Sequence, residues 1–307
     1  MDVMQTVPAS TYTGRFAPSP TGPLHFGSLV AALASYLDAR VHSGHWFVRI
    51  EDVDRQRSIK NADKAILDCL HAHGLQWDEP VRYQSACDDY YQTLINTFFS
   101  RQLAYYCTCT RKMIRQQGGG SACNCRNAKH GPAGAAVRIK LDTPVLSFND
   151  RIQGPQQAGS DCATEDMVLR RRDGHYAYNL AVVADDIKQG VTHIVRGSDL
   201  LPTTLAHLSL YQLLNAPPPT YAHIPVAATE PGYKLSKQNK ATAIDPHNAK
   251  QNLVQALKFL HLYVPDTLHG ASCDKILNWA TKHFKCETLP KVSEIIVDKQ
   301  QSAFYKD

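Results

Sequence analysis

The segment Pro18-Ser19-Pro20-Thr21-Gly22-Pro23 constrains the fold of this chain more than any other feature. Proline fixes the backbone and removes an N–H donor, so this segment can be neither helix nor strand. A strand-like run, Tyr12 to Ala17, precedes it, and apolar residues at helical spacing follow from Ser28 until Gly44 marks the region beyond the helix. A second, mostly apolar strand covers Trp46 to Ile50. The pattern predicts a β-α-β unit whose parallel strands are covered on both faces.

This unit also predicts a ligand-binding edge, because Glu51 follows directly on the second strand. Open α/β sheets bind ligands in the crevice beyond the carboxyl ends of their strands. We therefore expect Arg15, Ser19, His25 and Glu51 to converge there. The N-terminus of the helix favours phosphate, and Gly27 permits close approach of a ligand to the backbone. Considered alone, the same turn also fits an ordinary loop and helix cap.

A second cluster of polar residues is predicted in the middle of the chain. Residues 167–178 indicate a strand, an Asp-Gly turn and a return segment. Val191 to Val195 indicates another strand, followed by Arg196-Gly197-Ser198-Asp199, where the same crevice rule applies. The run Arg170-Arg171-Arg172 fits either a solvated hairpin face or a contact with phosphate.

The lysine loop Lys234-Leu235-Ser236-Lys237-Gln238 offers two ammonium groups and a hydroxyl, which suit ATP phosphates. Composition sets the wider frame: 307 residues, 43% hydrophobic and 20% charged, can bury a full core. No apolar run approaches the roughly 18 residues of a membrane span, and residues 1–8 lack the basic and apolar stretches of a secretory signal. We expect a cytoplasmic protein without membrane attachment, whose formal charge of +5 permits a polyanionic partner.

Four of the nine cysteines are clustered, as Cys107-Thr108-Cys109 and Cys123-Asn124-Cys125. The others stand alone and are expected to be reduced and buried. Four thiolates at this spacing could surround one tetrahedral zinc ion, and a segment with so little apolar content would gain stability from the metal. A redox or metal-free role remains the alternative.

Seven blocks of sequence, in this order, make residues 12–260 resemble a class I glutamyl-tRNA synthetase. The blocks are Gly14 to Gly22, His25-Phe26-Gly27-Ser28, Arg49-Ile50-Glu51-Asp52, Gly74-Leu75-Gln76-Trp77-Asp78, Arg170 to Gly174, Arg196-Gly197-Ser198-Asp199 and Lys234-Leu235-Ser236-Lys237. The resemblance implies an α/β fold, a Rossmann-type class I catalytic domain with a small zinc-binding insert and a short helical C-terminal appendage. It implies glutamate and ATP with Mg²⁺ as substrates.

The resemblance also assigns roles. The residues implied to bind glutamate are Arg15, Ala17, Ser19, Glu51, Tyr178 and Arg196. Those implied to bind ATP are His25, Gly27, Ser236 and Lys237, and those implied to act in catalysis are His25, Lys234 and Lys237. The chain departs from the family at Phe26 and Ser28, where the usual His-Ile-Gly-His has Ile and His, and at Gln238, where the lysine loop has Ser.

The short remainder of the chain narrows the resemblance to the glutamyl-queuosine tRNA(Asp) synthetase family. Residues 239–307 suit one helix at about 249–263, another at about 273–283 and a tail, but no anticodon-binding domain of the usual size. The family activates glutamate without tRNA and attaches it to queuosine at the wobble position of tRNA(Asp). The alternatives are a truncated glutamyl-tRNA synthetase that charges a tRNA 3′ end, and a non-catalytic paralogue that binds tRNA or regulates a partner.

These placements predict the division of the chain. Residues 12–100 and 150–240 would form the split catalytic domain, residues 101–149 the zinc-bearing insert, and residues 245–307 the helical C-terminal region. The insert would either contact the nucleic acid or pack over the site. Its metal ligands would be Cys107, Cys109, Cys123 and Cys125, with Cys123 replacing a family Tyr whose position holds Ser121. A monomer is expected.

Overall fold

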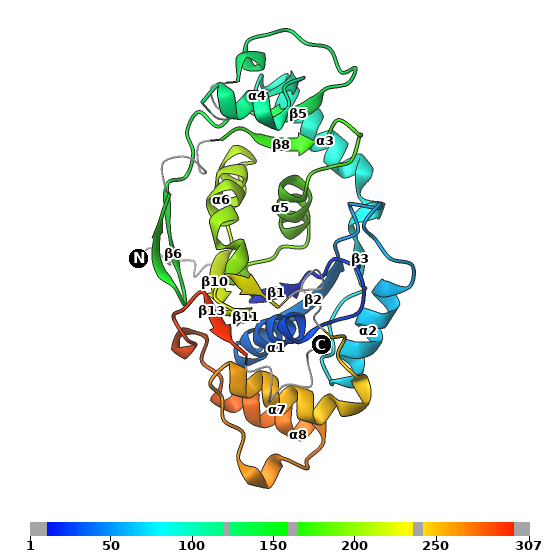
Figure 1. Ribbon diagram of the computed structural model, residues 1–307, viewed down its shortest axis with the longest axis vertical. Coiled ribbons are helices and arrows are strands. Elements are labelled where there is room, and N and C mark those ends of the chain that lie inside the picture. Colours follow the sequence, from blue (N-terminus) through cyan, green and yellow to red (C-terminus); the bar gives the residue numbers. More distant parts are fainter. Residues whose placement is uncertain (1–10, 119–122, 159–164, 236–241, 298–307) are drawn as a thin grey trace, which may run out of the picture.

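A computed structural model describes residues 11–118, 123–158, 165–235 and 242–297 (Figure 1). Its centre is a parallel sheet in which one set of strands runs in the order β1-β2-β3 and a second pair in the order β10-β9. The two sets meet at β1 and β9, where the Thr192 N–H donates to the Thr13 carbonyl at 2.9 Å. The bounds are β1 (Thr13–Phe16), β2 (His45–Ile50), β3 (Arg82–Tyr83), β9 (His193–Gly197) and β10 (Thr220–Ile224).

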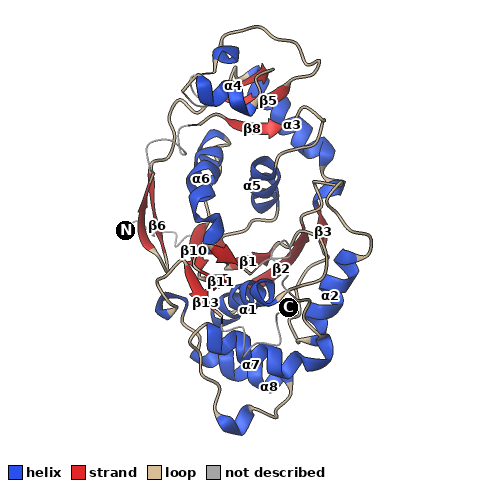
Figure 2. Ribbon diagram, in the orientation of Figure 1, coloured by secondary structure: helices blue, strands red, loops and turns tan. Residues whose placement is uncertain are grey.

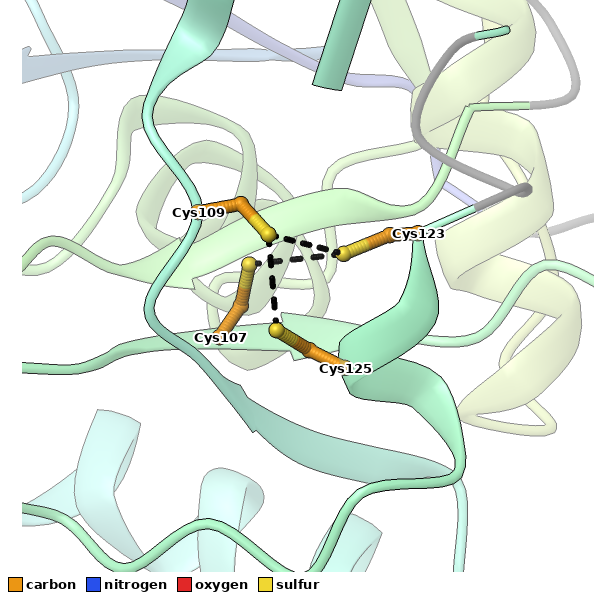
Figure 3. A group of neighbouring side chains, drawn as sticks. All are labelled: Cys107, Cys109, Cys123 and Cys125. Atoms are coloured by element: carbon orange, nitrogen blue, oxygen red, sulfur yellow. Dashed lines mark hydrogen bonds between the residues drawn. The ribbon is translucent and has the colours of Figure 1, made fainter. Parts of the chain in front are cut away.

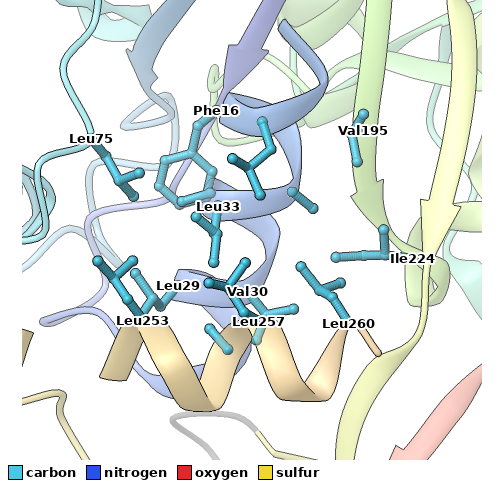
Figure 4. Packing of buried hydrophobic residues seen from close by; sticks show 14 of the residues in the cluster. Phe16, Leu29, Val30, Leu33, Leu75, Val195, Ile224, Leu253, Leu257 and Leu260 are labelled. Atoms are coloured by element: carbon cyan, nitrogen blue, oxygen red, sulfur yellow. The ribbon is translucent and has the colours of Figure 1, made fainter. Parts of the chain in front are cut away.

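Helices cover both faces of this sheet (Figure 2). On one face α1 packs against the sheet and against α7 and α8, and on the other α5 packs against α6 (Figure 1). Leu29, Val30 and Leu33 of α1 are fully buried against leucines of α7, which closes the largest apolar core (Figure 4). These helices are α1 (Phe26–Val41), α2 (Ala62–Ala72), α5 (Tyr178–Lys188), α6 (Thr204–Leu213), α7 (Ala249–Phe259) and α8 (Cys273–His283).

Gly44 lets the chain turn from α1 into β2. A Cβ at this position would lie 2.4 Å from the carbonyl oxygen of Tyr12, so only glycine fits. The neighbouring His45 N–H donates to that same oxygen at 2.9 Å, which starts the pairing of β2 with β1. The predicted β-α-β unit is therefore present, with its helix beginning two residues before Ser28.

A smaller antiparallel sheet, β4-β5-β8, lies at the far end of the molecule, beyond α5 and α6 (Figure 1). Its strand β5 pairs with β4 on one side and with β8 on the other. Residues 101–149 thus share a sheet with a strand beyond residue 150, and the predicted division of the chain stays a prediction. The elements of this region are α3 (Asp88–Ser100), β4 (Ala104–Cys107), α4 (Arg111–Gln116), β5 (Ala136–Ile139) and β8 (Met167–Arg170). The hairpin of β6 (Ser147–Asp150) and β7 (Gly154–Gln157) lies instead beside the central sheet, where β6 contacts β10 (Figure 1).

The C-terminal part of the chain returns to the central body. Strand β13 (Glu294–Ile296) pairs in parallel with β11 (Val226–Glu230), which also pairs with β12 (Tyr233–Lys234). Helix α8 has the predicted bounds, but α7 ends at Phe259 rather than near 263 because His261 adopts a left-handed φ of 60°. Single-turn 3-10 helices cover Gln84–Ala86, Asn124–Arg126, Pro246–Asn248, Asp266–Leu268 and Cys286–Thr288, and a longer one covers Ser198–Thr203.

One predicted strand is displaced. The sequence predicts a strand over Val191 to Val195, whereas β9 covers His193–Gly197 because its partner β10 pairs as far as Ile224 with Gly197. Arg196 therefore lies inside the strand rather than after it. Among the described helices, none combines the length and apolarity needed to cross a membrane.

Candidate active site

A pocket of about 410 Å³ lies at the carboxyl ends of β1, β2 and β9. All of the residues predicted to bind glutamate line it, together with the described residues predicted to act on ATP. These residues are Arg15, Ala17, Ser19, His25, Gly27, Glu51, Tyr178, Arg196 and Lys234. Ser236 and Lys237 lie outside the described residues. The fold thus brings both predicted groups into one cavity, and their individual roles stay predictions.

His25 caps the N-terminus of α1. Its backbone is extended and its Nδ1 accepts a hydrogen bond from the Ser28 N–H at 3.3 Å. The Ser28 hydroxyl is 3.0 Å from Nε2, so the residue that replaces the second family histidine holds the ring of the first. Since the end of α1 also supplies a partial positive charge, this corner of the pocket suits an anion.

The two motifs at His25 and Lys234 lie side by side although about two hundred residues separate them. His25 forms an isolated bridge with Ala243, and a Cβ on Gly27 would lie 3.8 Å from the Leu235 carbonyl oxygen. Lys234 Nζ donates to Asp199 Oδ2 at 2.6 Å, and both side chains are partly exposed. Exposed ion pairs of this kind contribute only about 0–1 kcal/mol, so a phosphate could replace Asp199 at little cost.

A buried charge network lies beneath the pocket. Asp186, on α5, accepts hydrogen bonds from Arg15 Nε at 3.1 Å and from a terminal nitrogen of Arg49 at 2.7 Å. Burial alone would raise the pKa of Asp186, but the two guanidinium groups outweigh it and lower the pKa. In the sequence, the only sign of this network is that the acidic pair Asp185-Asp186 follows an apolar stretch. That pattern does not show that Arg15 and Arg49 are the partners of Asp186.

Glu51 lies on the edge of the same network, 3.4 Å from the other terminal nitrogen of Arg49. Burial raises the pKa of Glu51, although Arg49 and Arg15 partly oppose the shift. Tyr178, at the start of α5, has its pKa raised to about 12 by burial and by the charge of Glu51, so its hydroxyl is neutral near pH 7. The Glu51 carboxylate and the neutral Tyr178 hydroxyl thus line the cavity. Burial makes the charged form of Glu51 unfavourable unless a cation pairs with it.

Arg196 differs from Arg15 in its partners. Its guanidinium is only 5% exposed and stacks 5.1 Å from the centre of the Tyr221 ring. Within the described part of the chain, no carboxylate oxygen lies within 4.0 Å of its nitrogens. A buried cation without an acidic partner is costly, which makes it a binding group for an anion that enters the pocket.

The run of three arginines at 170–172 is held by protein groups. Arg170 donates to Gln92 Oε1 at 2.8 Å, and Arg171 forms ion pairs with Asp54 at 3.1 Å and with Asp173. Arg172 donates to the Thr108 carbonyl, between two of the clustered cysteines. Of the two readings left open by the sequence, the structure favours the hairpin face.

The four clustered cysteines form a second candidate site, at the end of β4 and around the single turn at 124–126 (Figure 3). Their sulfur atoms all lie within 4.8 Å of one another. The Sγ–Sγ distances are 3.7 Å for Cys107–Cys123, 3.5 Å for Cys109–Cys125 and 3.8 Å for Cys109–Cys123. Four sulfurs placed 2.3 Å from a tetrahedral zinc ion would be about 3.8 Å apart, so the donor set fits such an ion.

The thiols of this cluster differ in acidity. Burial raises the pKa values of Cys107, Cys109 and Cys123. Burial would do the same for Cys125, but hydrogen bonds from the Thr108 backbone and from Cys109 outweigh it and lower the pKa to about 6. Metal binding would deprotonate the remaining thiols, because the thiolate is the ligand.

Comparison with known proteins agrees with this geometry. Residues 12–264 match the family described as class I tRNA synthetases (E and Q), catalytic domain. A glutamyl-Q tRNA(Asp) synthetase from Serratia proteamaculans (strain 568) is 48% identical over 296 residues, which cover 96% of this chain and 98% of that protein. Another, from Vibrio parahaemolyticus, is 47% identical and covers 92% of this chain and 96% of its own length.

The fold is also found among solved structures. The crystal structure of a glutamate tRNA ligase from Elizabethkingia meningosepticum, in complex with its amino acid, superposes with a TM-score of 0.76. The match covers 95% of this chain and 68% of that chain at 23% sequence identity. At this identity the likeness speaks for the fold alone. Together with the family match over residues 12–264, it confirms the predicted class I synthetase fold.

Proposed function

We infer the function of this chain from its family, because it belongs to the class I tRNA synthetases (E and Q) and among them to the glutamyl-Q tRNA(Asp) synthetases. We propose that it activates glutamate with ATP in the absence of tRNA. It would then transfer the glutamate to queuosine at the wobble position of tRNA(Asp). The family predicted from the sequence is confirmed by these matches, and with it the enzyme class, a ligase. The substrates and steps that follow are proposals.

The charge pattern of the pocket carries the proposal for glutamate. Glutamate has two carboxylates and one ammonium group, and the pocket offers Arg15 and Arg196 for the former and Glu51 for the latter. Within the described residues, no group accepts a hydrogen bond from the terminal nitrogens of Arg15, which leaves them for the ligand. A planar guanidinium matches a carboxylate better than an ammonium would.

The activation step needs positive charge around phosphate. The α-carboxylate of glutamate attacks the α-phosphorus of ATP, the bond to the β-phosphate oxygen breaks, and pyrophosphate leaves. We assign His25 and the α1 N-terminus, with Gly27 for close approach, to the phosphate oxygens, and Lys234, Ser236 and Lys237 to the leaving pyrophosphate. Lys234 would exchange Asp199 for phosphate in this step. Mg²⁺ would accompany ATP as it does in other phosphoryl chemistry.

The four cysteines are proposed to hold one structural Zn²⁺ ion. The distances between their sulfurs and their closed, thiol-only donor set suit a structural site rather than a catalytic one. Bound zinc would fix the turn at 124–126 against β4 and so hold the segment that Arg172 contacts.

The acceptor is proposed from the relatives, whose names specify tRNA(Asp) and whose lengths this chain covers almost entirely. Transfer of labelled glutamate to tRNA(Asp) with and without queuosine tests it, followed by nuclease mapping of the label. We expect label only on queuosine-containing tRNA and only in the anticodon loop. Label at the 3′ end would instead identify a charging synthetase, and no transfer would favour a non-catalytic role. A monomeric, cytoplasmic protein remains part of the proposal.

A further inference from the structure

A buried network holds the Arg196 guanidinium on the wall of the pocket. Its Nε donates to His223 Nε2 at 3.0 Å, and one terminal nitrogen lies 3.3 Å from His207 Nδ1. The other terminal nitrogen donates to the Thr204 hydroxyl at 2.9 Å and to the Leu200 carbonyl at 3.2 Å. Each of these partners is an uncharged acceptor when the histidines are neutral, so the network orients the cation without cancelling its charge.

A second layer of contacts fixes the tautomer of each histidine. His223 Nδ1 lies 2.6 Å from Asp150 Oδ2, and His207 Nε2 lies 3.0 Å from Asn179 Oδ1. A guanidinium N–H can only donate, so the ring nitrogens that face Arg196 must carry lone pairs. The proton of His223 therefore sits on Nδ1 and points to Asp150, and that of His207 sits on Nε2 and points to Asn179. Burial, reinforced by Arg196, lowers the pKa of both rings, which agrees with their neutral forms.

Comparison with Arg15 shows what this arrangement achieves. Arg15 is equally buried, but the carboxylate of Asp186 bonds it directly. At Arg196 the imidazole ring of His223 lies between the guanidinium and the carboxylate of Asp150. We propose that Asp150, His223 and His207 are positioning residues that hold Arg196 as an oriented, unpaired cation for a carboxylate of the substrate. This inference rests on the proposed function and deepens it.

An oriented Arg196 without an acidic partner also bears on the choice of substrate. Arg196 has no carboxylate partner in the described part of the protein, and we assign the side-chain carboxylate of glutamate to it. The neutral side-chain amide of glutamine in the same place would leave the buried charge uncompensated. The positioning residues should therefore affect the choice between glutamate and glutamine and leave the ATP side of the pocket, around His25, unchanged.

The sharpest variant is Asp150→Asn. Asp150 Oδ1 accepts the backbone N–H groups of Ile152, Gln153 and His223, and an Asn oxygen can keep these bonds. The new amide would then donate to His223 Nδ1, move the ring proton to Nε2 and point an N–H at Arg196. We expect the KM for glutamate in pyrophosphate exchange to rise about 10- to 100-fold with the KM for ATP unchanged.

Control variants at Asp166 and His223 distinguish a role in orienting Arg196 from a general loss of stability. Asp166→Asn changes an equally buried acid that accepts from Tyr105, Arg126 and the Leu141 N–H far from the pocket, and it should leave the glutamate KM unchanged. At position 223, His223→Gln keeps an acceptor near the place of Nε2, whereas His223→Met removes it. Gln should restore most of the glutamate affinity that Met loses.

Three outcomes would overturn the inference. An unchanged glutamate KM in Asp150→Asn, or an equal rise in both KM values, removes the positioning role. Imidazole ¹⁵N spectra that show a proton on Nε2 of wild-type His223 near pH 7 contradict the tautomer, whatever the activity. Wild-type protein that shows no exchange with glutamate would instead overturn the proposed function itself, and the spectra keep that failure distinct from a failure of the network.

Discussion

The pocket and the cysteine cluster are built in opposite ways. The pocket joins residues far apart in the chain, such as Arg15 and Asp186, and it rests on the largest apolar core of the molecule. The cysteine cluster joins residues between 107 and 125, and its apolar contacts reduce to Tyr105, Ile114 and the cysteines themselves. The fold itself holds the charges of the pocket in place, whereas we propose that a bound ion holds the four cysteines together.

Loss of a cysteine ligand should have the largest effect. In Cys125→Ser we expect the zinc to be lost, and with it the order of the segment around the cluster, because structural zinc contributes about 10 kcal/mol or more to the folding of such segments. Metal analysis and hydrogen exchange of the segment measure this, while the parallel sheet should keep its protection. Cys273→Ser, which alters a cysteine outside the cluster, should retain the metal. Unchanged zinc content in Cys125→Ser would remove the site.

The second largest effect is expected from loss of Asp186, which lies beneath the pocket and should lower the free energy of unfolding. Asp186→Ala leaves Arg15 and Arg49 buried without their shared acid, which is expected to cost about 3–5 kcal/mol of unfolding free energy. Denaturant titration measures the loss. Asp88→Ala breaks an exposed pair with Arg55 and should change stability by at most about 1 kcal/mol. Equal losses of unfolding free energy in Asp186→Ala and Asp88→Ala would show that the buried network contributes no more to stability than an exposed ion pair.

Arg196→Lys should act on binding more than on stability. The ammonium group of Lys lacks the planar set of N–H donors of the guanidinium and cannot contact His223 and His207 at the same time. We therefore expect kcat/KM for glutamate to fall roughly 100-fold. Steady-state pyrophosphate exchange with varied glutamate measures the change. Near-normal kcat/KM would show that the geometry of the guanidinium is unimportant.

The pH dependence of glutamate binding should be the smallest effect. Burial raises the pKa of Glu51, so its carboxylate takes up a proton at a higher pH than an exposed Glu would. A protonated Glu51 cannot pair with the substrate ammonium, and the KM for glutamate should therefore rise as pH falls through this pKa, by at most about tenfold per pH unit. The KM for ATP serves as the control. A profile that is the same in Glu51→Gln would assign the titration to another group.

The sequence predicted the parts of the fold that local patterns determine. The three prolines, the helical spacing from Ser28 and the apolar strand at 46–50 led to the β-α-β unit, and α8 has its predicted bounds. The four cysteines were grouped correctly because they are close in the sequence and share one chemistry. Each of these features is local.

The features that the sequence did not reveal depend on contacts between distant segments. Arg15 and Asp186 are 171 positions apart, and Asp150 and His223 are 73 apart. His223 lies in an apolar strand and Asp150 ends a short hairpin strand, so neither pattern suggests a role in the pocket. The shift of β9 to 193–197 has the same origin, because its register depends on β10.

Pyrophosphate exchange with ATP in the absence of tRNA tests the central claim, that this pocket activates glutamate, most directly. The pocket geometry predicts exchange with glutamate and a kcat/KM for glutamine at least about 100-fold lower, because only glutamate supplies a second carboxylate for the guanidinium groups. No exchange with glutamate, or equal exchange with glutamine, would contradict the account.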